Sequence, residues 1–360
     1  MKILVTGGAG FIGSNFIHHI RRQHPDWCVI ALDKLTYAGN LANLAPVRND
    51  PQVSFIQMDI CDRATLDVMR GCDVVVNFAA ETHVDRSIES AAAFVRTNVE
   101  GTFRLLESCR EARVPRFLQI STDEVYGSLG WEGKFSETTP LAPTSPYAAT
   151  KAAADLLVLT YVNTHHIPAI ITRCSNNYGP YQFPEKFIPL MIVQAMDNRA
   201  LPVYGDGRNI RDWIYVEDHC RALDLVLQQG REGEIYNIGG DCEMENIAVA
   251  RRILHSLERP DDLVRYVTDR PGHDRRYAID CAKIKSELGW VQRFDFSRGL
   301  AATIEWYRKN SAWLSEICTA SYRDYVTRHY GNRDATLAAV KPCSADGGSS
   351  VASATADAGG

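Results

Sequence analysis

Short apolar runs alternate with helix-length segments across the first half of the chain. The runs are nearly continuous in apolar residues, which is typical of parallel strands covered on both faces. Between several of them, apolar residues recur at helical spacing, as at Val99, Phe103, Leu106 and Cys109. This alternation predicts an α/β protein with a doubly wound parallel sheet and right-handed crossovers. The predicted strands are Lys2–Thr6, Val29–Asp33, Val53–Ile60, Val74–Ala80, Arg116–Thr122 and Ala169–Cys174.

After about residue 175 the pattern changes and predicts a smaller C-terminal α/β lobe over residues 176–330. It begins with a segment rich in Asn, Tyr, Gly and Pro over residues 176–186, which predicts a long ordered loop. We expect residues 1–175 to form the first domain, with some later segments returning to it. Residues 335–360 hold few large apolar side chains, and this composition predicts a disordered tail. The later predicted elements are strands at 201–204 and 235–238 and helices at 219–229, 246–257 and 281–288.

The segment from Ala152 to Val162 is apolar almost all round. A helix of this kind is buried on more than one side. Two interpretations are open: a deep core position, or packing against a second subunit. We favour a homodimer formed through the helices near residues 99–112 and 151–166.

Composition narrows the class of protein. Apolar residues make up 45% and charged residues 23% of the chain, as in a globular domain. The formal net charge of −5 argues against a general nucleic-acid binder. The ten cysteines include no CxxC pair, which indicates a reduced, intracellular protein. No signal peptide and no apolar run of about 18 residues is seen, so we expect a cytoplasmic location with no membrane partner.

A glycine-rich turn follows the first predicted strand. Gly7, Gly8, Gly10 and Gly13 fit both common spacings of a dinucleotide-binding loop, in which the backbone approaches a pyrophosphate at a helix N-terminus. Asp33 ends the next strand, where a carboxylate accepts hydrogen bonds from ribose hydroxyls and repels a 2′-phosphate. This arrangement predicts NAD rather than NADP, although the neighbouring Lys34 is a weak signal in the other direction.

Two later strand ends add to the predicted cofactor site. Asp59 and Ile60 follow the third strand, where a carboxylate can bond the adenine amino group, and a turn or cap role is the alternative. Ala79 and Ala80 follow the fourth strand, where small side chains let the cofactor pass close to the backbone.

The catalytic prediction depends on two neighbouring motifs. Tyr147 and Lys151 are four residues apart and share one helix face, with Thr122 at the end of the fifth strand. A tyrosine acts as a base on an alcohol only if its pKa falls well below about 10, and a nearby ammonium favours this. Asp123 and Glu124 are not needed for hydride transfer and indicate a second, acid–base step. The alternative for these carboxylates is a capping box that begins at Ser121.

Together these motifs resemble those of the extended short-chain dehydrogenase/reductase family, and within it the enzymes that dehydrate dTDP-glucose at C4 and C6. The resemblance covers about residues 1–310 and implies a Rossmann-type fold. The matching segments are Thr6–Gly13, Asp33–Asn40, Ala79–Ser87, Ser121–Gly127, Ser145–Lys151, Asn176–Gln182, Arg211–Trp213 and Asp269–Tyr277.

The resemblance implies a role for each residue. Tyr147, with Thr122, takes the proton of the C4 hydroxyl while hydride moves to a tightly held NAD. Glu124 then removes the C5 proton, Asp123 protonates the departing C6 hydroxyl, and hydride returns to C6. The residues alone also permit the opposite assignment of the two carboxylates. The implied cofactor residues are Gly7, Gly10, Phe11, Ile12, Gly13, Asp33, Lys34, Leu35, Thr36, Asp59, Ile60, Ala79, Ala80, Thr97, Tyr147, Lys151 and Asn177.

A nucleoside diphosphate sugar needs positive charge at its diphosphate, and arginine forks match phosphate oxygens. The expected substrate residues are Thr82, Thr122, Asn176, Lys186, Arg211, Asn246, Arg270 and His273. We expect no metal site, and we interpret His83 and His273 as hydrogen-bonding residues. Three alternatives stay open: dehydration of UDP-glucose or another nucleotide sugar, a sugar-nucleotide epimerase, which leaves Asp123 and Glu124 unexplained, and a non-catalytic NAD-binding regulator.

Overall fold

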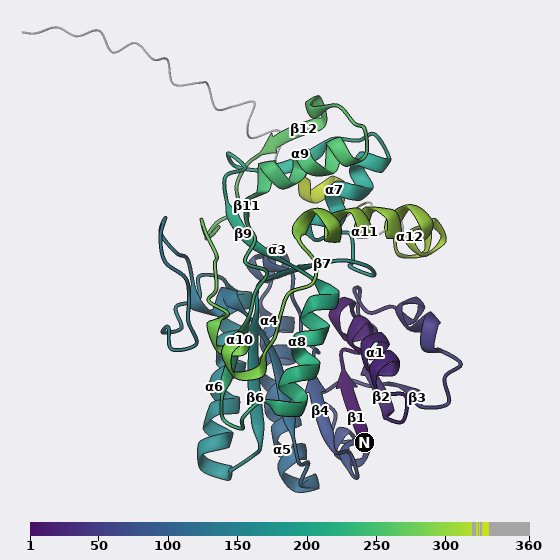
Figure 1. Cartoon of the computed structure of the whole chain (residues 1–360), viewed down its shortest axis with the longest axis vertical. Coiled ribbons are helices and arrows are strands. Elements are labelled where there is room, and N and C mark those ends of the chain that lie inside the picture. The colour runs from purple at the N-terminus through teal and green to yellow at the C-terminus, as the bar shows by residue number, and fades with distance from the viewer. Residues whose placement is uncertain (319–321, 323, 325, 331–360) are drawn as a thin grey trace, which may run out of the picture.

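A seven-stranded parallel sheet forms the larger part of the molecule (Figure 1). The computed structural model of the chain describes residues 1–318, 322, 324 and 326–330. The strand order is β10-β6-β5-β4-β1-β2-β3, so the predicted doubly wound α/β fold is confirmed. Its strands are β1 (Lys2–Thr6), β2 (Cys28–Asp33), β3 (Val53–Gln57), β4 (Val74–Asn77), β5 (Phe117–Thr122), β6 (Ala169–Cys174) and β10 (Ile235–Ile238).

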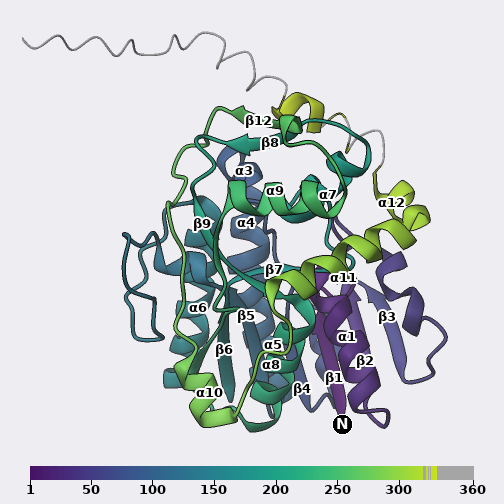
Figure 2. The same cartoon turned by 45° about the horizontal axis from the view of Figure 1, so that its top comes forward.

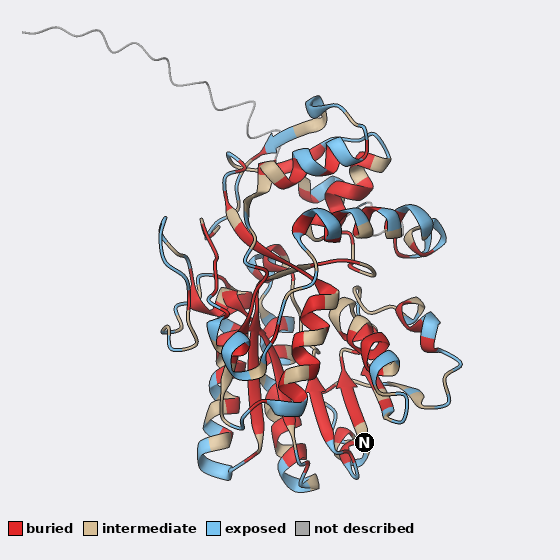
Figure 3. Ribbon diagram, in the orientation of Figure 1, coloured by how far each residue is buried: buried red, intermediate tan, exposed pale blue. Residues whose placement is uncertain are grey.

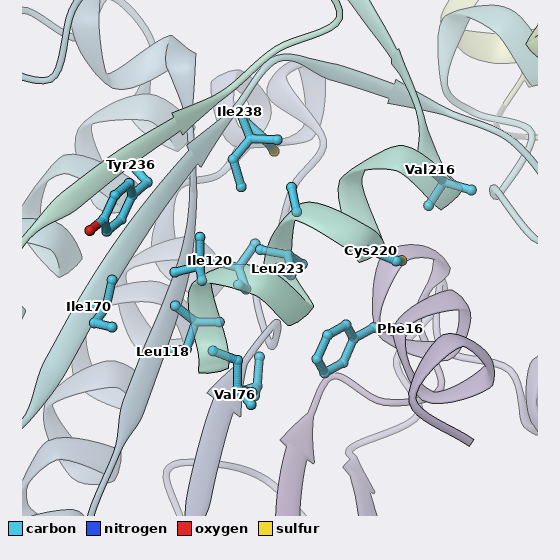
Figure 4. Close-up of a cluster of buried hydrophobic side chains, with 14 of the residues drawn as sticks. Phe16, Val76, Leu118, Ile120, Ile170, Val216, Cys220, Leu223, Tyr236 and Ile238 are labelled. Atoms are coloured by element: carbon cyan, nitrogen blue, oxygen red, sulfur yellow. The ribbon is translucent and has the colours of Figure 1, made fainter. Parts of the chain in front are cut away.

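Helices cover both faces of this sheet, which explains the continuous apolar strands. Successive side chains of β1 point to opposite faces: Ile3 and Val5 join the core beneath α1 and α8, and Leu4 joins the core beneath α5 and α6. Figure 4 shows Phe16 of α1 and Leu223 of α8 in the first of these cores. The surrounding helices are α1 (Phe11–Gln23), α2 (Thr65–Met69), α3 (Val84–Glu89), α4 (Ala92–Phe94), α5 (Thr102–Ala112), α6 (Pro146–His165), α8 (Val216–Gln229) and α10 (Ala282–Leu288).

The smaller lobe lies above the carboxyl ends of the main strands (Figures 1 and 2). It has a core of its own, which includes Tyr178, Met191 and Tyr307, and Figure 3 shows the buried faces of its helices turned inward. It contains a three-stranded sheet and a two-stranded sheet. The elements are β7 (Asn176–Tyr178), β8 (Leu201–Tyr204), β9 (Ile210–Tyr215), β11 (Glu243–Glu245), β12 (Val264–Val267), α7 (Phe187–Met196), α9 (Asn246–Ser256), α11 (Phe296–Lys309) and α12 (Ser311–Ile317).

The structure changes several expected boundaries. β3 ends at Gln57 and β4 at Asn77, because the next residues leave the sheet and line a cavity. Residues 176–178 form β7, which pairs with β9, instead of opening a loop. β10, from the later part of the chain, lies in the main sheet and pairs with β6.

One helix has an irregular start. Residues Val95–Gly101 form a π-helical turn before α5, and a π turn inside a helix is frequently found at functional sites. The predicted tail at 335–360 lies outside the described residues. Among the described helices, none is both long and apolar enough to cross a bilayer.

Topology fixes the place of the site. The chain leaves β1 in one direction toward β2 and β3, and returns to the other side of β1 at β4. In doubly wound sheets, ligands bind in the crevice at the carboxyl ends of the strands where the order reverses.

Candidate active site

A cavity of about 280 Å³ opens at this edge of the sheet and continues under the smaller lobe. It brings together motifs from β1, β2, β4, β5, α6 and the segment after β6. The predicted site residues that line it are Gly7, Gly10, Phe11, Ile12, Gly13, Asp33, Lys34, Thr36, Asp59, Ile60, Ala79, Ala80, Thr82, Thr97, Thr122, Asp123, Glu124, Tyr147, Lys151, Asn176, Asn177 and Lys186.

Leu35 is the one predicted cofactor residue that does not line this cavity. It is absent from the lining of this cavity, and its side chain packs against the core under α1. Its backbone has a positive φ of 58°, and its N–H donates to Asp33 Oδ1 at 2.8 Å. The turn therefore directs the leucine side chain away from the cavity, and cofactor binding by Leu35 stays a prediction.

The glycine loop fits a pyrophosphate. Gly7 has φ +67°, and a Cβ there would lie 2.7 Å from the backbone nitrogen of Ala79. A Cβ on Gly13 would lie 2.3 Å from the carbonyl oxygen of Gly7. Only glycine allows these close backbone approaches, so the first turn of α1 stays open to a dinucleotide.

Replacing Gly13 should therefore damage cofactor binding. Overpacking of this kind costs about 1–3 kcal/mol, so we expect Gly13→Ala to weaken NAD binding about ten-fold or more. Calorimetric titration of cofactor-stripped protein with NAD measures this. Gly130→Ala is the matched control, because a Cβ there has no atom within 4 Å. Equal NAD affinity in both variants would contradict the assignment of the loop.

The charges beside the loop favour NAD. Asp33 is buried, and its Oδ2 accepts a hydrogen bond from Ala9 N–H at 3.0 Å, which ties the loop to β2. Burial raises its pKa, although bonds from backbone N–H groups oppose the rise. Lys34 pairs with Asp59 at 2.8 Å. The Lys34 charge is thus directed at a carboxylate, which weakens the indication from the sequence that Lys34 binds the 2′-phosphate of NADP.

Asp123 and Glu124 lie directly after β5 in a single 3₁₀ turn, Asp123–Tyr126. Its N-cap is Thr122, whose Oγ1 accepts from Glu124 N–H at 3.3 Å. The alternative capping box from Ser121 is therefore not formed. The turn leaves Asp123 Oδ2 buried with no hydrogen-bond partner among the described residues. A carboxyl oxygen in this state has a free position for a ligand group.

The two carboxyl groups differ in their surroundings. Burial, then Glu124 and then Asp212, raise the pKa of Asp123 well above its usual value. Burial also raises the pKa of Glu124, but the positive charges of Arg270, Lys186 and Arg211 oppose this rise. The strongest charges acting on Asp123 are negative and those acting on Glu124 are positive, although Arg211 also lowers the pKa of Asp123 and Asp274 also raises that of Glu124. The asymmetry supports Asp123 as acid and Glu124 as base.

Tyr147 and Lys151 extend from the first turns of α6, which Ser145 caps through Ala148 N–H at 3.1 Å. Lys151 Nζ donates to the Ile120 carbonyl at 2.7 Å, and burial lowers the pKa of this lysine. Burial raises the pKa of Tyr147 well above its usual value, and Glu124 raises it further, while a hydrogen bond with Thr122 lowers it. The expected low phenol pKa is therefore not a property of the chain alone.

The predicted substrate residues divide into two groups. Thr82, Asn176 and Lys186 line the cavity, and Lys186 Nζ is fixed by the Thr82 carbonyl at 2.6 Å. Arg211, Asn246, Arg270 and His273 are not part of that lining and belong to the smaller lobe.

Pairing of β9 with β11 and with residue 276 brings this second group together. Arg211 is buried, donates to the Asp274 carbonyl at 3.0 Å, and lies over the Tyr277 ring at 4.3 Å. Asn246 Oδ1 is buried with no partner among the described residues. His273 bonds Asp269 at 2.5 Å, and His83 caps α3, so both histidines make hydrogen bonds, as predicted. No group of metal-ligating side chains is found in the described part of the chain.

Sequence reasoning missed Glu81 and Glu185, which line the cavity, and the residues that hold them in place. Arg86 pairs with Glu185 at 3.2 Å and lies over the Tyr37 ring at 4.0 Å, so three segments meet there. Asn98, in the π turn, exchanges hydrogen bonds with the backbone of Glu81. Several of these residues lie inside the segments that carry the family resemblance, and that position was the available signal.

The chain is similar to known proteins over most of its length. The GDP-mannose 4,6 dehydratase family model matches residues 4–303. The chain belongs to this family. It is 54% identical over 322 residues to the dTDP-glucose 4,6-dehydratase of Streptomyces niveus. That match covers 88% of this chain and 96% of the relative.

Solved structures of family members give the same fold. The dTDP-glucose 4,6-dehydratase of Streptomyces venezuelae, solved with NAD bound, is 50% identical with a TM-score of 0.86 and covers 88% of this chain and all of that one. UDP-glucuronic acid 4-epimerase of Bacillus cereus, solved with UDP-glucuronic acid and NAD, is 28% identical with a TM-score of 0.82. That match covers 86% of this chain and 99% of the epimerase chain. The shared fold thus includes both dehydratases and epimerases, and the residues at the end of β5 become the deciding feature.

Proposed function

We propose that the chain is an NAD-dependent dTDP-glucose 4,6-dehydratase that forms dTDP-4-keto-6-deoxyglucose and water. The observation that carries this is the Asp123–Glu124 pair, whose two carboxyl groups have different charged neighbours, in the same cavity as Tyr147. An epimerase needs only reversible oxidation at C4 and gives no role to this pair.

A bound dinucleotide would be held by the Gly7–Gly13 loop, Asp33 and Ala79. When bound, NAD supplies the hydride acceptor for C4 and the hydride donor for C6. Tyr147 removes the proton of the C4 hydroxyl, and the hydrogen bond with Thr122 favours the phenolate. Lys151 contributes positive charge and is kept in place by the Ile120 carbonyl.

Elimination of water then uses the carboxyl pair. The C4 ketone acidifies the C5 proton, and Glu124, ionised beside three cationic side chains, accepts it. Hydroxide is a poor leaving group, so the C6 oxygen takes the proton of Asp123 as its bond to carbon breaks. A proton returned to C5 completes the 4-keto-6-deoxy sugar. Arg211, Arg270 and Lys186 supply the positive charge that a diphosphate needs.

Incubation with dTDP-glucose and with UDP-glucose, followed by the base-induced absorbance of the 4-keto product, tests the proposal. We expect kcat/KM for dTDP-glucose to exceed that for UDP-glucose. A higher value for UDP-glucose would transfer the proposal to the UDP-sugar dehydratases. No keto product from either nucleotide sugar would contradict it.

We further propose a homodimer through α5 and α6. The two helices pack together on one face of the sheet, and Leu156 on α6 is 54% exposed. A monomeric mass at micromolar concentration would contradict this.

We also propose a cytoplasmic location. The nine cysteines in the described residues are free, which supports it.

A further inference from the structure

The last described segment, residues 326–330, lies against β8, beyond the residues that the family model matches (Figure 2). His329 is buried, with 9% of its surface exposed. Its Nε2 lies 2.9 Å from the Tyr204 hydroxyl and 3.5 Å from Asp85 Oδ2, and its Nδ1 lies 3.7 Å from Glu89. Residue 329, which is far in sequence from the catalytic motifs, thus contacts α3 at Asp85 and Glu89.

Asp85 connects this histidine to the site. Tyr204 donates to Asp85 Oδ2 at 3.1 Å, and Arg270 Nη1 lies 3.8 Å from Asp85 Oδ1. Burial raises the pKa of Asp85, but the hydrogen bond from His329 and the charge of Arg270 outweigh burial and hold the pKa below its usual value. The buried carboxylate is therefore ionised, with the Tyr204 hydroxyl at one of its oxygens and the Arg270 guanidinium near the other.

Arg270 connects Asp85 to the chemistry. Its positive charge is the first of the three that lower the pKa of Glu124. Asp85 is its one side-chain ion-pair partner in the residues described, and its Nε is buried without a hydrogen bond there. The direction of this guanidinium therefore depends on where Asp85 is held.

We propose that His329 is a positioning residue for the dehydration, holding Asp85 so that Asp85 directs Arg270 toward Glu124 and the substrate diphosphate. The proposal rests on the proposed function, because Arg270 is taken as a diphosphate ligand. Without the donor at position 329, Asp85 shifts, and Arg270 shifts with it, away from the diphosphate and Glu124. Substrate binding weakens first, since both ground state and transition state use the diphosphate contact.

The experiment compares His329→Phe with His329→Gln, which keeps a donor for Asp85. His255→Gln is the matched control, because that histidine side chain is 72% exposed on α9. Loss of the His329 contacts with the Tyr204 hydroxyl and the Asp85 carboxylate is expected to raise KM for dTDP-glucose, and the inhibition constant of dTDP, by on the order of ten-fold in the phenylalanine variant. The glutamine variant should stay near wild type, and bound NAD should be unchanged in all three.

Asp85→Asn provides a second route that does not depend on the folding of the phenylalanine variant. We expect Asp85→Asn to raise KM by a similar factor. Combining it with His329→Phe should raise KM little further, because both residues act on Arg270 through the same series of contacts. Additive losses, or equal KM values in His329→Phe and wild type, would overturn the proposal. If the wild type accepts only another nucleotide sugar, the function fails, while the variant ratios measured with that sugar still test His329.

Discussion

Asp123→Asn is expected to lower kcat by about 10²–10⁴-fold while C4 oxidation continues. The amide keeps the shape of the side chain and removes the proton that the C6 oxygen needs. On mixing with dTDP-glucose, reduced nicotinamide should therefore accumulate and remain, because the hydride has no C6 acceptor. Rapid-mixing absorbance measures the accumulation, and the base-induced absorbance of the keto product measures the loss of turnover.

A substrate with a better leaving group separates acid from base. Fluoride at C6 departs without protonation, so dTDP-6-deoxy-6-fluoroglucose should restore elimination in Asp123→Asn. Glu124→Gln is the comparison: it lacks the base for C5, and the fluoro sugar should not restore it. Rescue of the glutamine variant alone would reverse the two roles.

The pH dependence of kcat gives an independent check. Asp123 works protonated, so the rate falls as pH rises through its raised pKa; Glu124 works ionised, so the rate falls as pH drops through its raised pKa. The pair titrates as a coupled unit. Asp123→Asn should lose the alkaline limb of the residual rate, and Glu124→Gln the acidic limb.

Local signals were sufficient for the fold and for the cofactor loop. The continuous apolar strands, the glycine spacing and the position of Asp33 can each be recognised within a stretch of about thirty residues. The strand order then brings the carboxyl ends of these strands to one edge of the sheet. The position of Leu35 could not be read in this way, because a positive φ at one residue reverses the direction of its side chain. A sequence pattern does not report that angle.

The proposed assignment of acid and base rests on the folded chain. Asp123 and Glu124 are adjacent in sequence, and an isolated Asp is the stronger acid. What separates them are Asp212, which acts on Asp123, and Arg270 and Lys186, which act on Glu124, all from 60 or more residues away. Tertiary contacts of this range are set by the packing of the smaller lobe on the sheet and leave no periodic trace in the sequence.

Tyr147→Phe is expected to block the reaction one step earlier, with a loss of about 10²–10⁴-fold. The phenol oxygen is the group placed to take the C4 hydroxyl proton. Burial and the Glu124 charge raise the pKa of this phenol, and the hydrogen bond with Thr122 opposes the rise. Removing the oxygen leaves no base at that position, while the ring keeps its packing against Phe94.

The spectroscopic signature separates this variant from Asp123→Asn. With dTDP-glucose, Tyr147→Phe should leave the nicotinamide oxidised, whereas Asp123→Asn should show it reduced. Tyr161→Phe is the matched control, since that hydroxyl lies on the same helix but bonds Glu107 at 2.8 Å, outside the cavity lining. Its turnover should equal wild type, and the purified variants should carry equal NAD. Accumulation of reduced nicotinamide in Tyr147→Phe would mean that another group takes the C4 proton, and the assignment of Tyr147 as base would be abandoned.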